Sequence, residues 1–236
     1  MKAKERIKER IKRNRYGKMF LELYGFKTAV LAVCSAVINF GFAVGNLVCA
    51  FVYGSAWYYA FSAYYFALII FRLAVVLADN KLGKKYAEDD KKHLLARNRI
   101  QLAGGIYLVL VEIAMAVGIS LTIIFGRPAK SGEIMAIATA AYAFFKITMA
   151  SINLARAKRH GDPVVQSLRN LNFADACMTM ASLTVILLAT FGKREEARFA
   201  TVMNSAVGFA ACLAVLALAV LMISDALKNI KRLTRN

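Results

Sequence analysis

Residues 28–53, TAVLAVCSAVINFGFAVGNLVCAFVY, form an apolar run without a single charged side chain. A helix of about 20 apolar residues crosses the hydrocarbon core of a bilayer, so this run is long enough to span a membrane. Further apolar runs lie at 56–78, 102–125, 134–155, 171–191 and 200–224. The sequence therefore predicts an all-α membrane protein that is built as a six-span transmembrane helical bundle.

The composition of the 236 residues argues against an ordinary soluble domain. Hydrophobic residues make up 59% of the chain and the mean hydropathy is +0.52, whereas soluble globular proteins are about 45–50% apolar. The formal net charge is nevertheless +18, from 32 Lys and Arg against 14 Asp and Glu. Such a surplus is typical of nucleic-acid binders as well as of membrane proteins with basic loops, so the positions of the charges decide.

Most of the positive charge falls on one side of the predicted bundle. Four segments, 1–27, 79–101, 156–170 and 225–236, hold 25 of the 32 Lys and Arg residues, whereas the three connections on the other side hold five. Loops rich in Lys and Arg stay on the cytoplasmic side of a membrane. We therefore expect a protein of the cell membrane, the bacterial cytoplasmic membrane, with both termini in the cytoplasm. Topology explains the surplus, and no nucleic acid partner is expected.

This topology divides the chain into three parts. Residues 1–27 form a basic cytoplasmic arm, 28–224 the six-span domain and 225–236 a short basic cytoplasmic tail. The arm is either an interfacial helix that lies on anionic lipids of the inner leaflet or a solvated arm that only sets the orientation. The lipid bilayer is the expected partner in both cases.

The sequence shows no catalytic machinery. Its two histidines, His93 and His160, lie in predicted cytoplasmic segments, so no imidazole is available within a span. HExxH, GxSxG and Walker motifs are absent. We therefore predict that the protein is not an enzyme, and neither a cofactor nor a metal ion is expected.

Four ionisable residues lie inside the predicted spans: Arg72, Glu112, Lys146 and Asp175. Charges within a bilayer are costly and are functional candidates by default. At a rise of about 1.5 Å per residue, Glu112 and Lys146 lie near the midplane, and Arg72 and Asp175 lie in the inner third. The sequence predicts two ion pairs, Glu112 with Lys146 and Arg72 with Asp175. They form either a polar pathway through the bundle or structural links that fix helix register.

The second and fifth predicted spans resemble those of the cation diffusion facilitator family. Residues 54–60, GSAWYYA, precede Tyr64, Tyr65 and Leu68, much as a G-S-x-A-L-L-A run precedes metal ligands in that family. In the fifth span, the family's S-P-x-L…H-x-x-x-D-x-x-x-S-L course is followed by Asp162-Pro163, Leu168-Arg169, Asp175, Met178 and Ser182-Leu183. The resemblance covers roughly residues 20–225, and it implies the six-helix transmembrane domain of a transporter.

The chain departs from this family at the metal site. The resemblance places Tyr64, Leu68, Ala174 and Met178 at the four ligand positions, and none of these side chains can bind a zinc-like ion. The family's cytoplasmic C-terminal domain is also expected to be lost. The resemblance therefore implies a degenerate metal site on a transporter-like scaffold that does not move zinc-type metals.

Aromatic residues take the place of that polar site. The cavity candidates are the former ligand positions and their neighbours, Phe61, Tyr64, Tyr65, Leu68, Ala174 and Met178. Arg72 lies two turns below Tyr64 on nearly the same helix face. These side chains either line a cavity suited to an amphipathic or anionic organic solute or simply fill the space.

Three hypotheses of function remain open at this stage. The first is a multi-pass transporter-like protein that acts on an unknown substrate. The second is a non-transporting membrane protein that assembles as a homodimer or with a membrane partner. The third is a substrate-binding subunit of an energy-coupled importer, because such subunits are also small, have six spans and lack catalytic motifs.

Overall fold

The computed structural model describes residues 24–85, 90–125, 133–192 and 197–235, so the predicted basic arm lies almost entirely outside the described residues. The described residues form helices and no strands, as the sequence predicted. The helices are α3 (Tyr24–Tyr53), α4 (Ala56–Lys85), α5 (Asp90–Phe125), α6 (Glu133–His160), α7 (Pro163–Phe191) and α8 (Ala197–Arg235).

Four of these helices are long and apolar enough to cross a membrane. The qualifying stretches are Ala56–Leu82 in α4, Asp90–Leu121 in α5, Pro163–Phe191 in α7 and Phe199–Arg235 in α8. In α3 the apolar stretch Ala36–Val52 is shorter, and α6 carries Lys146 near its middle. The four apolar helices indicate a membrane location.

The helices continue beyond the predicted spans at the end predicted to be cytoplasmic. α4 runs on to Lys85, α5 begins at Asp90, and α8 has 39 residues. The described residues of the segments 79–101, 156–170 and 225–236 are therefore mostly helical, which the sequence analysis did not predict. Lys, Arg and Glu are good helix formers, so a helix can leave the apolar layer without ending.

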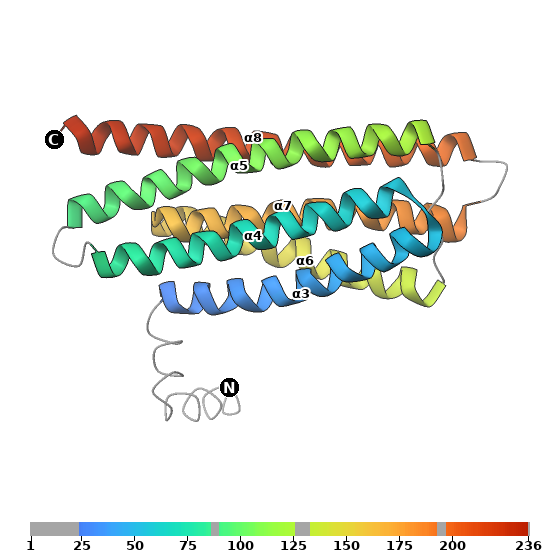
Figure 1. Ribbon diagram of the computed structural model, residues 1–236, viewed down its shortest axis with the longest axis horizontal. Helices are drawn as coiled ribbons and strands as arrows, with labels where there is room; N and C mark the ends of the chain where they lie inside the picture. Colours follow the sequence, from blue (N-terminus) through green and yellow to red (C-terminus); the bar gives the residue numbers. More distant parts are fainter. Residues whose placement is uncertain (1–23, 86–89, 126–132, 193–196, 236) are drawn as a thin grey trace, which may run out of the picture.

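α7 lies at the centre of the bundle. It packs against α3, α4, α5, α6 and α8, whereas among the described residues the backbone of α6 packs closely only against α7. α5 packs against α8 on one side of the bundle, and Figure 1 shows α3 (blue) and α6 (yellow) on the opposite side. A site on α7 is therefore within reach of most of the other helices.

The helices form two units of three with matching dimensions. α3, α4 and α5 have 30, 30 and 36 residues, and α6, α7 and α8 have 28, 29 and 39. In each unit a glycine with positive φ follows the first helix, Gly54 (φ 59°) and Gly161 (φ 69°), and these glycines lie 107 positions apart. This left-handed conformation favours glycine, and it allows the chain to reverse within two residues.

A shift of 107 positions also matches the buried residues of the two units. In α3 the buried alanines Ala36, Ala43 and Ala50 correspond to the buried Ala143, Ala150 and Ala157 of α6. A spacing of seven keeps residues on one helix face. Buried positions match along the other helices too: Phe61 with Leu168, Leu68 with Asp175, Phe71 with Met178, Leu108 with Val215, Glu112 with Ala219 and Met115 with Met222.

Two hydrogen bonds between α4 and α7 correspond to each other under the same shift of 107 positions. The Tyr65 hydroxyl bonds with Thr179 Oγ1 at 3.2 Å, and Arg72 Nη2 donates to Asn172 Oδ1 at 2.7 Å. Asn172 and Thr179 are the counterparts of Tyr65 and Arg72, so each bond is the image of the other. α3 and α6 run in opposite directions in Figure 1. The bundle is therefore an inverted repeat whose units meet at α4 and α7.

The packing of α5 against α8 depends on Gly105. A Cβ at this position would lie 2.5 Å from Ile223 Cγ1 and 3.2 Å from the Ala219 carbonyl oxygen, whereas a Cβ at Gly41 of α3 would have nothing within 4 Å. Overpacking in a close-packed contact costs about 1–3 kcal/mol. We expect Gly105→Val to lower the unfolding free energy by about that much more than the control Gly41→Val. Unfolding by SDS titration in mixed micelles measures both, and equal losses would contradict the described α5–α8 contact.

Candidate functional site

The buried carboxylate of Asp175 on α7 is the centre of a polar cluster. Lys146 Nζ of α6 donates to Asp175 Oδ1 at 2.6 Å, and Asn39 Nδ2 of α3 donates to Oδ2 at 2.7 Å. Arg72 Nη2 of α4 lies 3.9 Å from Oδ2 and forms the predicted ion pair, although its shorter bond is to Asn172. One carboxylate thus connects side chains of four helices from both units.

Aromatic rings surround the ammonium group of Lys146. The ring centroids of Phe42, Tyr65 and Tyr142 lie 5.7, 5.6 and 5.4 Å from Nζ. A cation within about 6 Å of an aromatic ring centroid is attracted by the ring's quadrupole. Nζ also donates to Thr179 Oγ1 at 2.9 Å. Lys146 is therefore held by a carboxylate and a hydroxyl within an aromatic cage.

Glu112 belongs to a different contact. Its Oε1 accepts a hydrogen bond from the Tyr64 hydroxyl at 2.9 Å. The predicted pair of Glu112 with Lys146 is wrong, because Lys146 bonds to Asp175. The physical reason is the position of α6: in the described chain its backbone packs against α7, whereas Glu112 on α5 faces α4 and α8. Equal depth did not make the two residues neighbours.

The cavity candidates all lie in one hydrophobic core beside the cluster. Phe61, Leu68, Ala174 and Met178 are completely buried, and Tyr64 and Tyr65 nearly so. The rings are in contact, with centroid distances of 4.5 Å for Trp57–Phe61 and 6.3 Å for Phe61–Tyr65. The predicted aromatic side chains are therefore packed against one another. The polar groups of α7 lie next to them.

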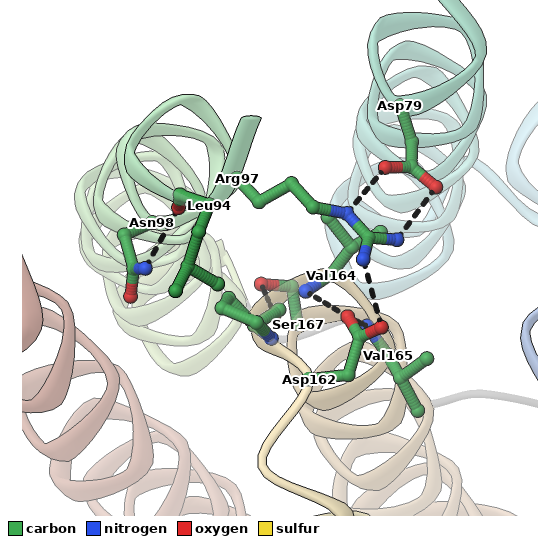
Figure 2. Close-up of polar contacts among 9 residues, drawn as sticks. Asp79, Leu94, Arg97, Asn98, Asp162, Val164, Val165 and Ser167 are labelled. Carbon is green, nitrogen blue, oxygen red and sulfur yellow. Dashed lines mark hydrogen bonds and ion pairs between the residues drawn. The ribbon is translucent and has the colours of Figure 1, made fainter. Parts of the chain in front are cut away.

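A second charged contact, which the sequence reasoning missed, joins three helices at the end predicted to be cytoplasmic. Arg97 of α5 makes two bonds to Asp79 of α4, at 2.7 and 3.1 Å, and one bond of 2.9 Å to Asp162 before α7 (Figure 2). We call these three residues the ionic staple. Asp162 also caps α7, because its Oδ1 accepts from the backbone N–H groups of Val164 and Val165. The dipeptide Asp162-Pro163 is a recognisable helix start, and it is the sequence signal that could have drawn attention to Asp162.

The ionic staple is not repeated at the equivalent described positions of the other end. The shift of 107 positions places Ile186 at Asp79 and Asn204 at Arg97, and the counterpart of Asp162 is Ser55. None of these three side chains carries a charge. The two ends of the bundle therefore differ at these three positions, because one end carries an ionic contact there and the other carries uncharged side chains.

Comparison with protein-family models, curated protein sequences and solved structures found no match to this chain. The resemblance to cation diffusion facilitators stays a prediction. In the part of the chain that the structure describes, no three His, Cys, Asp or Glu side chains come together as a metal-binding group.

The double role of Asp162 leads to a testable ranking. Asn caps a helix about as well as Asp but carries no charge, and loss of an N-cap costs about 0.5–2 kcal/mol. We expect Asp162→Asn to lower the melting temperature of the purified protein slightly, through the weakened contact with Arg97, and Asp162→Ala to lower it further. Asp79→Asn is the matched control for the charge, because Asp79 caps no helix in the described chain. If Asp162→Asn and Asp162→Ala melt alike, the cap does not stabilise α7.

Proposed function

We propose that the protein is a six-span, transporter-like membrane protein, not an enzyme, with both termini in the cytoplasm. The observation that carries the proposal is the polar cluster around Asp175, which lies where the two inverted units meet. In transporters built from inverted repeats, substrate sites lie at the interface of the repeats near the bilayer midplane. Buried charges inside a membrane are also functional candidates by default.

Six spans are supported by the lengths and the pairing of the helices. α3 and α6 have 30 and 28 residues, which at 1.5 Å per residue corresponds to about 45 and 42 Å, more than the roughly 30 Å of a hydrocarbon core. α6 is the repeat counterpart of α3. Its Lys146 bonds to Asp175 inside the bundle, so this charge does not prevent α6 from crossing the membrane.

The one-sided ionic staple supports a cycle of alternating access. Arg97 closes the cytoplasmic end by joining α4, α5 and α7, and the repeat-equivalent positions at the outer end, Ile186, Asn204 and Ser55, carry no charge. Rocking of one unit against the other would open the cytoplasmic end when these bonds break and would close the outer end. The site around Asp175 would then face each side in turn.

The cargo in this proposal is not a zinc-type metal ion. The cluster offers one carboxylate, and Lys146 and Arg72 beside it are bases that repel a divalent cation. The former ligand positions Leu68, Ala174 and Met178 hold apolar side chains. Both features support a cargo other than a metal.

Cysteine accessibility at two repeat-equivalent positions tests this cycle. Val75 lies on the cytoplasmic side of the cluster on α4, and its counterpart Ser182 lies on the outer side on α7; both are buried. In a variant whose four native cysteines are replaced by alanine, we expect Val75→Cys and Ser182→Cys each to react with a membrane-impermeant maleimide. Val75→Cys reacts from the cytoplasmic side of inverted vesicles, and Ser182→Cys from the outside of right-side-out vesicles.

Removal of the staple provides the decisive comparison. Arg97→Ala should increase labelling at Val75→Cys and decrease it at Ser182→Cys, because the open population shifts toward the cytoplasm. The control Lys228→Ala, on an exposed position of α8, should change neither. A static membrane subunit, the rival function, predicts no labelling at either position and no effect of Arg97→Ala.

A further inference from the structure

The cluster around Asp175 has a surplus of one positive charge. Lys146 and Arg72 are both bases, and Asp175 is the acid that they share. Glu112, the other acid inside the predicted spans, bonds to Tyr64 instead. Both bases donate to protein acceptors, and among the described residues they share Asp175 as their acid. Two buried bases that share one acid leave the charge of the cluster unbalanced, which is costly inside a membrane, and an anion would lower that cost.

The cluster can be approached between α3 and α6. The backbones of these two helices are not closely packed in the described chain, and the helices meet through the stacked rings of Phe42 and Tyr142, whose centroids lie 5.1 Å apart. Lys146, directly behind these rings, is the least buried of the charged residues in the cluster, with 11% of its side chain exposed, against 1% for Arg72 and Asp175. A ligand that displaces one ring reaches the charges without separating two packed helices.

An unused hydrogen-bond acceptor lies at the same place. Asn39 is completely buried, and its Nδ2 donates to Asp175. Its Oδ1 has no donor among the described residues. A buried acceptor without a partner is costly, so the site lacks a donor as well as a negative charge. A ligand hydroxyl would supply that donor.

These observations define the chemistry of one ligand. We propose that the cluster binds an amphipathic organic carboxylate that also carries a hydroxyl group. Its carboxylate neutralises the charge shared by Lys146 and Arg72, its apolar body packs against the cage of Phe42, Tyr65 and Tyr142, and its hydroxyl donates to Asn39 Oδ1. This inference rests on the proposed function, because the ligand is the cargo of the transporter.

Three naphthalene probes of equal size test the charge preference. They are 6-hydroxy-2-naphthoate, its uncharged amide and the cationic 6-(aminomethyl)-2-naphthol, titrated by calorimetry into the purified full-length protein in an uncharged detergent. We expect saturable binding of the carboxylate, and binding of the amide and the cation that is about ten-fold weaker or more. Saturable binding of the cation in preference to the carboxylate, or no saturable binding at millimolar carboxylate, would overturn the proposal.

Substitutions of the charged residues give effects of opposite sign. Arg72→Gln and Lys146→Met should each weaken binding of the carboxylate about ten-fold or more, and Arg72→Lys, which keeps the charge, should retain most of it. Asp175→Asn should strengthen carboxylate binding because it raises the surplus charge. Glu112→Gln changes the net charge of the chain equally but lies outside the cluster, and it should have no effect. Each variant is first checked for monodispersity by gel filtration.

The sign of the Asp175→Asn effect distinguishes the proposal from its main rival. A site for organic cations would use Asp175 as its counterion, so that Asp175→Asn would abolish binding. The proposal fails if that variant loses carboxylate binding while it remains monodisperse. The accessibility experiment at Val75 and Ser182 uses no ligand, so alternating labelling without carboxylate binding would refute the ligand and leave the proposed function standing.

Discussion

The carboxylate of Asp175 is the interaction on which the interior of the bundle depends. It accepts hydrogen bonds from Lys146 of α6 and Asn39 of α3, and Arg72 of α4 lies beside it. In the described chain the backbone of α6 packs against α7, and α6 reaches α3 and α4 through side chains, so this carboxylate is a polar link that orients α6. In a low-dielectric interior such bonds are strong, and a base left without its acid is expensive.

The charged residues break the symmetry of an otherwise repeated frame. The repeat counterparts of Asp175, Arg72, Lys146 and Glu112 are Leu68, Thr179, Asn39 and Ala219, and none of them is charged. The glycine turns, the alanine faces and the bonds between α4 and α7 are shared by both units. The shared features build the bundle. The charged residues that have no charged repeat counterpart form the cluster and the ionic staple.

Much of the architecture followed from the sequence, because the length of an apolar run and the position of a charge can be judged within one short stretch of chain. The helices and the burial of Arg72, Glu112 and Asp175 belong to this part. The pairing of charges did not follow, because helical rise gives the depth of a residue but not which helix is its neighbour. Two acids and two bases can pair in two ways, and the structure follows neither, because both bases lie beside Asp175 and Glu112 bonds to Tyr64. The repeat was missed because few residues are identical between the units, although the seven-residue alanine spacing and the two glycine turns were visible signals.

The central claim, that Asp175 and Lys146 act as one unit in holding the bundle, is tested most directly by a double-mutant cycle. Each residue is replaced by its repeat counterpart, Asp175→Leu and Lys146→Asn, singly and together, and the unfolding free energy is measured in mixed micelles. Removing one partner of a buried ion pair costs about 3–5 kcal/mol. The account predicts that each single variant is strongly destabilised and that the double variant recovers about 2 kcal/mol or more relative to the sum of the two losses. Additive losses would contradict it.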